Sequence, residues 1–455
     1  MMNLNSLWIK LFEENRLLLG SRSSELMNSR RNAALEQFKL KGIPSTKVET
    51  YKYTDLQPFF GTDTKHSFLS GKKTMRIPDF FHCNVESMEV YTYFTVNGYF
   101  VQPEGDMQLP EGVIVESFAE ATVKHASLVA QYYGEIAPAK TDAFVALNTM
   151  FALDGYFIYI PQKTALTKPI QIVNILIDDE NLNASQRNMV ILDDMAQAQI
   201  IVCDHTLSAA QFVMNTVTEV QTGESAILDF CNLQNQHNHS AQVGGFFVNQ
   251  EKYSVARTNF ITLNAGMARN NISVRLGGAN AECFLSGLYL CDKNQHVDNF
   301  TSIDHAVADC CSNELFKGVM DDASTAIFTG KIMVRTDAQR TVAYQSNNNL
   351  LLTSEARINT APQLTIYADD VKCSHGATVG QLDKNALFYM RQRGISHKEA
   401  NILLQYAFAY EVIEKIKVPA LKEQIRSLVE KRFRGQLDKC DSCTLCGRFD
   451  NKVGC

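Results

Sequence analysis

Apolar and polar positions near the start of the chain follow a helical spacing. Leu26, Leu35 and Phe38 share one helical face, and Gly42-Ile43-Pro44 provides a stop signal after them. An amphipathic helix is also expected around Trp8. We therefore expect residues 1–84 to be largely helical.

From about residue 85 to residue 372 the spacing changes to alternation. Ile272, Val274 and Leu276 alternate with Ser273 and Arg275, the period of two expected of a strand with one buried face. The same alternation recurs on one face at Ala326, Phe328, Gly330, Ile332 and Val334, and again at Leu364, Ile366 and Ala368. We expect many short strands and almost no helix over roughly two hundred residues.

The pattern then returns to helices. Residues 385–393 have a helical pattern, and Gly394 is well placed to end it. Ser396 and Glu399 form a capping box ahead of a further apolar pattern. Pro419 suits the first turn of one more helix.

So many short strands in one stretch need closure or stacking to protect their edges. A sandwich, a propeller and a parallel β-helix would each meet that need. No clean repeat period is visible that would select a propeller. The residue pattern alone predicts a mainly β core between helical ends.

Composition narrows the possible partners and compartment. The chain has 455 residues, 45% of them hydrophobic and 20% charged, which is enough apolar content for folded domains. A net charge of -6 argues against nucleic acid or an anionic membrane as a partner. Charges at Lys10, Glu13 and Glu14 interrupt the apolar pattern that a secretory signal would need. We expect a cytoplasmic protein, whose thiols are kept reduced.

Common catalytic motifs are missing from the sequence. It contains no P-loop for ATP, since the segment Ser70-Gly71-Lys72-Lys73-Thr74 lacks the upstream glycine and the spacing. We therefore do not expect an enzyme that uses these catalytic motifs. A carbohydrate-active enzyme is the rival, since many parallel β-helices bind polysaccharides, but the chain shows no secretion signal and has only one Trp to stack on sugars.

The strongest local feature lies between the β core and the C-terminal helices. Cys373 and His375 are two residues apart, so in an extended segment both side chains point to one side. A thiolate and an imidazole suit a soft metal or an iron–sulfur cluster, and Lys372 beside them would lower the thiol pKa. Two ligands do not complete a site, so another chain or a substrate must supply the rest. The purely structural alternative is a packed thiol beside a hydrogen-bonded histidine.

Other cysteines and histidines have simpler interpretations. Four cysteines lie in strand-like apolar surroundings and are expected to pack in the core, namely Cys203, Cys231, Cys283 and Cys291. His237 and His239 fit a solvated loop. The vicinal pair Cys310 and Cys311 cannot face one side of a strand, which favours structural placement over redox chemistry.

The polar C-terminal tail holds four cysteines, Cys440, Cys443, Cys446 and Cys455. Four thiols on a flexible segment could wrap a zinc ion or an iron–sulfur cluster, or they could be loose thiols prone to oxidation. Because the tail has few apolar residues, any order in it would have to come from a metal.

The region from Ser312 to Gly394 resembles the SufB/SufD family of iron–sulfur cluster assembly proteins. The matching stretches are residues 312–319, 328–332, 348–352, 361–378 and 387–394. The chain looks closer to the SufD branch, because Gly376 stands where SufB typically carries an acidic residue. Residues 47–56 also resemble the SufD N-terminal motif, with Tyr51 where Trp is common. The cysteine tail is not a general feature of the family.

This resemblance implies a right-handed parallel β-helix with helical domains at both ends. It implies pairing with a SufB-like subunit through the core and with a SufC-type ABC ATPase through the C-terminal helices. A transient iron–sulfur cluster would be shared with SufB at an interface site where His375 corresponds to the SufD histidine, with Cys373 as a near neighbour. ATP would act only through the SufC partner, whose motion would open the interface.

We accordingly expect a helical N-terminal domain over residues 1–84, a β-helix core over 85–376, a helical C-terminal domain over 377–435 and a cysteine tail over 436–455. The alternative is a stand-alone SufD-like homodimer that binds metal or an iron–sulfur cluster through the tail. The resemblance leaves open the cluster type, the source of iron and the oligomeric state of the isolated chain.

Overall fold

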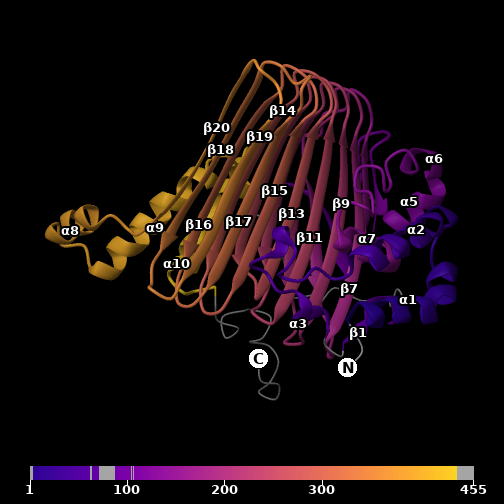
Figure 1. Cartoon of the computed structure of the whole chain (residues 1–455), viewed down its shortest axis with the longest axis horizontal. Coiled ribbons are helices and arrows are strands. Elements are labelled where there is room, and N and C mark those ends of the chain that lie inside the picture. Colours follow the sequence, from indigo (N-terminus) through magenta and orange to yellow (C-terminus); the bar gives the residue numbers. More distant parts are fainter. Residues whose placement is uncertain (1–3, 62–63, 71–87, 104, 106, 438–455) are drawn as a thin grey trace.

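The computed structural model describes residues 4–61, 64–70, 88–103, 105 and 107–437. Its centre is a parallel β-solenoid of about seven turns (Figure 1). The mainly β fold between helical ends that the resemblance implied is therefore confirmed as a parallel β-helix.

Successive strands of the solenoid alternate between two sheets that face each other. The first sheet contains β5 (Tyr156–Ile160), β7 (Leu182–Leu192), β9 (Phe212–Thr222), β11 (Ser240–Gln250), β13 (Met267–Leu276), β15 (His296–His305), β17 (Thr325–Val334) and β19 (Arg357–Ile366). The second contains β6 (Ile170–Leu176), β8 (Gln197–Thr206), β10 (Ile227–Asn235), β12 (Val255–Asn264), β14 (Glu282–Cys291), β16 (Cys311–Met320), β18 (Thr341–Leu351) and β20 (Val371–Gly380).

Each strand pairs in parallel with the strands one turn before and one turn after it. Ile227 pairs with Gln197, 30 residues earlier, and with Val255, 28 residues later. Parallel pairing requires a long crossover, and here the opposite sheet supplies it. One turn of the solenoid thus uses about thirty residues, and inward-facing side chains of successive turns stack in rows.

The interior between the two sheets is a continuous packed core. Val202, Leu228, Ile272 and Val334 belong to one buried cluster that extends through most of the turns. Burial of this apolar surface is the main favourable term for the solenoid, at about 25 cal/mol per Å². Positions between the core residues face outward, which is why alternation was readable in the sequence.

The N-terminal end of the solenoid is covered. Antiparallel strands close it: β2 (Tyr91–Val96) pairs with β3 (Tyr99–Val101), and β4 (Ile114–Ser117) pairs with β5. A two-residue strand, β1 (Lys65–His66), pairs with β7. Figure 1 shows helices packed at the same end of the molecule.

Most of these N-terminal helices precede the β region. They are α1 (Leu4–Ser21), α2 (Glu25–Lys41), a short 3-10 helix η1 (Glu49–Tyr51), α3 (Gln57–Phe60) and α4 (Ser67–Ser70). The amphipathic helix expected around Trp8 is confirmed as α1, which buries Trp8 and Phe12. Three more helices lie within the range where we expected almost none, namely α5 (Phe118–Lys124), α6 (Ala126–Val129) and α7 (Ala143–Phe151). Every residue of α7 is buried, so its sequence lacks the separate apolar and polar faces by which a helix is predicted.

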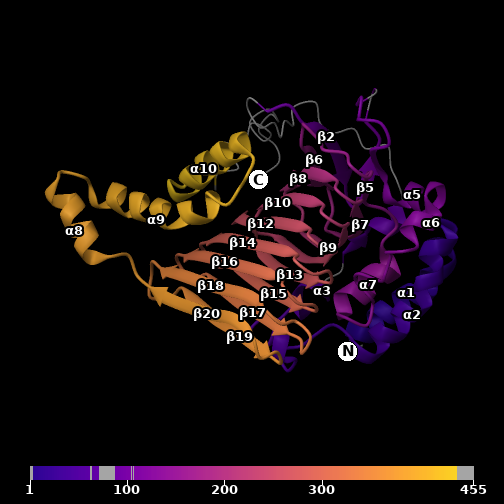
Figure 2. The ribbon, with the colours of Figure 1, turned by 90° about the horizontal axis from the view of Figure 1, so that it is seen from above.

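The C-terminal helices are α8 (Lys384–Gln392), α9 (His397–Ile413) and α10 (Pro419–Phe433). The Ser396 half of the predicted capping box is confirmed, because its hydroxyl accepts a hydrogen bond from the Glu399 amide at 3.2 Å, whereas the Glu399 carboxylate accepts from Arg434. Pro419 begins α10, also as predicted. Helices α9 and α10 pack on the outer face of the second sheet, whereas α8 projects away from the body (Figure 2).

Among the described residues, no helix is both long enough and apolar enough to cross a bilayer. The solenoid itself extends to Gly380, so the last strand runs a few residues past the limit of 376 that we expected for the β core.

Candidate functional site

The C-terminal end of the solenoid is open. Strand β19 pairs with β17 and strand β20 pairs with β18, and within the described part of the chain neither has a second neighbour. Figure 2 shows both strands at the edge of the ribbon. From Ser374 to Gly380 every residue of β20 is exposed. Because an edge strand presents unpaired N–H and C=O groups, this end is ready to pair with another chain.

Cys373 and His375 both lie on this open edge. They are the third and fifth residues of β20, so their side chains point to the same side of the strand. The Cys373 side chain packs against the interior cluster of the solenoid and is half-buried, while His375 is exposed. Both therefore face the interior at the point where it opens to solvent.

Burial raises the pKa of the Cys373 thiol, and a backbone hydrogen bond to Ala343 opposes that rise in part. The expectation that Lys372 would lower this pKa is wrong. Lys372 lies one residue earlier on the strand, so its side chain points to the opposite face. Burial therefore favours the neutral thiol of Cys373, and coordination to a metal would favour the thiolate.

Two side chains beneath the open end were missed by sequence reasoning. Gln345 on β18 occupies the position paired with His375, and Glu314 on β16 occupies the position paired with Gln345. Nε2 of Gln345 donates a hydrogen bond to Oε2 of Glu314 at 2.6 Å. Burial raises the pKa of the Glu314 carboxyl to about 7, with Gln345 and Thr301 opposing the rise. No motif links residues one turn apart, so only knowledge of the register would have found them.

The other cysteines and histidines singled out in the sequence divide into packed and exposed groups. The four core cysteines are confirmed as buried thiols: Cys203, Cys231, Cys283 and Cys291. Cys310 is buried at the entry to β16, and Cys311 is half-buried. His237 is half-buried beside Phe212 and His239 is exposed, both in the turn between β10 and β11.

The tail cysteines Cys440, Cys443, Cys446 and Cys455 lie outside the described residues. Within the described residues, no three His, Cys, Asp or Glu side chains come together in a way that could hold a metal ion. Cys373 and His375 are therefore an incomplete ligand set by themselves.

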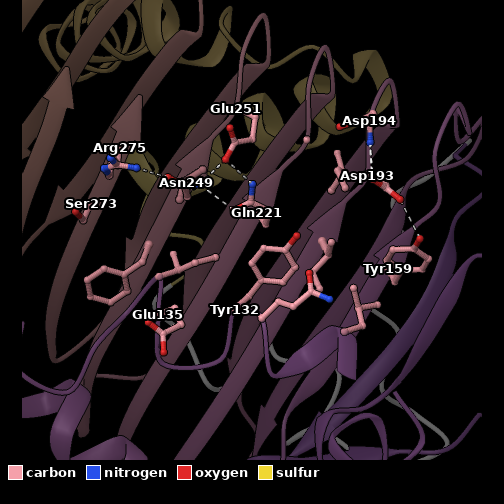
Figure 3. A pocket seen from close by; sticks show the side chains of 18 of the residues that line it. Tyr132, Glu135, Tyr159, Asp193, Asp194, Gln221, Asn249, Glu251, Ser273 and Arg275 are labelled. Carbon is pink, nitrogen blue, oxygen red and sulfur yellow. Dashed lines mark hydrogen bonds between the residues drawn. The ribbon is translucent and has the colours of Figure 1, made fainter. Parts of the chain in front are cut away.

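A separate groove lies on the outer face of the first sheet, beside the segment that follows α6 (Figure 3). It has a volume of about 800 Å³ and is lined by Tyr132, Tyr159, Asp193, Glu251 and Arg275, among others. Its carboxylates are already engaged. Asp193 accepts from Tyr159 at 3.1 Å, and Glu251 accepts from Asn249 at 3.2 Å. These acidic groups therefore stabilise the turns that connect the strands.

The N-terminal motif at residues 47–56 attaches to the solenoid of the same chain. The guanidinium of Arg269 on β13 lies 4.4 Å from the centre of the Tyr51 ring and forms an ion pair with Asp298 on β15. Thr54 donates a hydrogen bond to the same Asp298 carboxylate. Tyr51 and Thr54 thus attach the N-terminal segment to the outer face of the first sheet.

The fold and the open end define a parallel β-helix protein that is covered at one end and available for pairing at the other. Comparison with known families identifies it further. The family model for the SUF system FeS cluster assembly, SufBD core domain, matches residues 175–408. The model for the SufBD protein N-terminal region matches residues 2–172. The chain belongs to the SufBD family.

Similar proteins cover nearly the full length of the chain. An iron–sulfur cluster assembly SufBD family protein of Synechocystis sp. is 28% identical over 438 residues, which span 93% of this chain and 95% of the relative. The iron–sulfur cluster assembly protein SufD of Escherichia coli is 28% identical over 406 residues, spanning 88% and 92%. The chloroplastic protein ABCI7 of Arabidopsis thaliana is 27% identical over 426 residues, spanning 91% and 88%. The chain is therefore a SufD-like member of the iron–sulfur cluster assembly family.

Proposed function

We propose that this protein is the SufD-type scaffold subunit of a cytoplasmic SUF complex. It pairs with a SufB-like subunit at its open end and with a SufC-type ABC ATPase through α8 and α9. A transient iron–sulfur cluster, the cargo of the complex, is built where His375 meets ligands from the SufB-like subunit. The chain acts as a scaffold and not as an enzyme.

The observation that carries this proposal is the uncovered end of the solenoid with His375 on its last strand. An interior closed at one end and open at the other can be completed by a second chain that continues the strand order. His375 and Cys373 offer one nitrogen and one sulfur, both of which are cluster ligands. Because two ligands do not complete a site, the remaining ligands come from the partner.

The ATPase surface follows from the projecting helix. No residue of α8 is buried, and its Phe388 and Tyr389 side chains are 65% and 58% exposed. Large exposed aromatic side chains on an isolated helix are typical of a protein interface. The sequence has no P-loop of its own, so ATP enters the complex only through this partner.

A route connects the ATPase surface with the open end. Lys317 on β16 forms an ion pair with Glu411 of α9 and donates to the backbone oxygen of Phe408 at 3.2 Å. The neighbouring position on β18 is Asn348, whose Oδ1 accepts from the Thr378 hydroxyl on β20 at 2.8 Å. Movement of α9 would therefore act on the strands that form the open end, which is how nucleotide-driven motion would expose His375.

Anaerobic affinity purification of the chain from its host tests the proposal, with co-eluting proteins, iron and acid-labile sulfide measured together. We expect a SufB-like protein and an ABC-type ATPase to co-elute. The variant His375→Ala should retain both partners and lower the cluster content by about tenfold or more. His239→Ala, which removes an exposed imidazole far from the open end, is the matched control and should behave as wild type.

Wild-type cluster content in His375→Ala would show that the assigned role is wrong. A chain that elutes without partners, as a homodimer carrying iron and sulfide, would instead support cluster binding through Cys440, Cys443, Cys446 and Cys455.

A further inference from the structure

Two buried carboxylates in the interior of the solenoid, Asp204 and Glu314, are paired in different ways. Asp204 on β8 accepts hydrogen bonds from three side-chain amides, those of Asn174, Asn232 and Gln242. Glu314 accepts from one side-chain amide, that of Gln345, and lies beside the Thr301 hydroxyl. The pair of Glu314 and Gln345 is thus less completely satisfied than a structural network requires.

The Gln345 amide is held in one orientation. Its Nε2 is bonded to Glu314, and Gly330 on β17 lies against the same nitrogen from the opposite sheet. A Cβ at Gly330 would come within 2.3 Å of Nε2, closer than atoms can approach. The glycine therefore provides the space in which Gln345 can bond to Glu314.

Fixing the nitrogen leaves the carbonyl end of the amide unused. Oε1 of Gln345 is buried and has no hydrogen-bond partner within the described residues. A buried acceptor without a partner is unfavourable, so a donor that reaches this oxygen would stabilise the folded chain. The position paired with Gln345 on the next strand is His375, and side chains paired across adjacent strands lie roughly 4.8 Å apart.

We propose that Gln345 is a positioning residue for His375, whose imidazole N–H donates to the carbonyl oxygen Oε1 of Gln345. This bond selects one tautomer and one ring orientation, and it leaves the other ring nitrogen directed toward the open end. Histidines that bind metals almost always donate their second N–H to a carbonyl, a carboxylate or water. Glu314 and Gly330 act one step further away, by holding the Gln345 amide.

The inference rests on the proposed function for the role of His375 as a cluster ligand, but the hydrogen bond itself does not. The first readout is therefore the tautomer of His375 in the purified full chain. Imidazole ¹⁵N chemical shifts distinguish the two tautomers at a pH well above the ordinary imidazole pKa of about 6.5. Comparison with His375→Asn assigns the signals.

In the wild type we expect a single dominant tautomer for His375. Gln345→Leu removes the acceptor, and Gly330→Ala displaces the amide from the opposite sheet, so both should give a mixture of tautomers. Gln242→Leu is the matched control, because it removes an interior glutamine that donates to the other carboxylate, Asp204. It should leave the His375 signals unchanged, and thermal unfolding checks that each variant is folded.

The second readout is cluster assembly by the complete complex. Gln345→Leu should lower it by about 10-fold to 100-fold. Unchanged His375 signals in both Gln345→Leu and Gly330→Ala would overturn the inference. So would wild-type assembly in Gln345→Leu when His375→Ala abolishes it. Wild-type assembly in His375→Ala would instead refute the proposed function, whatever the tautomer.

Discussion

Arg187 and Glu219 form an ion pair with a 2.6 Å contact between Nη2 and Oε2, and their side chains are 1% and 0% exposed. The second carboxylate oxygen of Glu219 accepts backbone N–H bonds from Gly134 and Ala137, both at 2.9 Å. The Tyr133 ring lies 4.9 Å from the Arg187 guanidinium. This cluster attaches the segment between α6 and α7 to the outer face of the first sheet.

Breaking that pair should strongly destabilise the protein. Glu219→Gln leaves the Arg187 charge buried without compensation, which costs about 3–5 kcal/mol in the free energy of unfolding. The exposed pair of Arg335 and Asp304, bonded at 2.7 Å, is the control, and Arg335→Gln should cost less than about 1 kcal/mol. Urea unfolding followed by circular dichroism measures both. Equal effects of the two substitutions would contradict the prediction.

The sequence predicted the individual helices and strands better than it predicted how the strands close into a solenoid. Alternation such as that of Ile272, Val274 and Leu276 predicted strands because one face of each is buried. The turn of about thirty residues left no visible repeat, because stacked interior positions hold unlike side chains. Leu285, Glu314 and Gln345 occupy one such row. Only the family resemblance selected the β-helix.

For the same reason, the sequence predicted only part of the candidate site. Cys373 and His375 lie two residues apart on one strand, so a local motif revealed them. Gln345 and Glu314 are brought together by register across a full turn, 31 residues apart. A pairing of that kind depends on closure of the solenoid, which no local pattern encodes.

The stability of the protein should depend on pH through Glu314. Its pKa rises from 4.5 in the unfolded chain to about 7 in the folded one, because burial disfavours the charged form. The folded state therefore binds the proton more tightly. Stability from this group is complete below pH 4.5 and falls as the pH rises to about 7, by about 3 kcal/mol.

Glu314→Gln isolates this effect, because the amide is neutral at every pH and its carbonyl can still accept from Gln345. The difference in unfolding free energy between variant and wild type should grow in favour of the variant as the pH is raised, and then level off above about pH 7. Urea unfolding at a series of pH values measures it. A difference that does not change with pH would mean that Glu314 has an ordinary pKa.

The projecting helix α8 should contribute to partner binding and hardly at all to stability. Replacing both Phe388 and Tyr389 by alanine removes exposed side chains from a helix with no buried residue, so the unfolding free energy should change by less than about 0.5 kcal/mol. Recovery of the ABC-type ATPase in affinity purification should fall by about tenfold or more, because aromatic side chains dominate interfaces. Tyr253→Ala, at a residue 49% exposed on the solenoid, is the control. Full ATPase recovery with the α8 variant would move the ATPase surface elsewhere.

A charge on the open edge should prevent pairing with the second scaffold subunit. Val379 lies on β20, is 48% exposed and shares the side of the strand that carries Cys373 and His375, so Val379→Lys places a charge on the edge strand where the interior opens to solvent. Lysine on an edge blocks strand-to-strand association, because pairing would bury the charge. We expect the SufB-like subunit to be lost from the complex in native mass measurements while the thermal unfolding temperature stays unchanged. Val123→Lys makes the same change on α5, at a residue 67% exposed and at the covered end, and should leave the complex intact. Loss of the subunit with Val123→Lys but not with Val379→Lys would show that pairing uses the covered end of the solenoid.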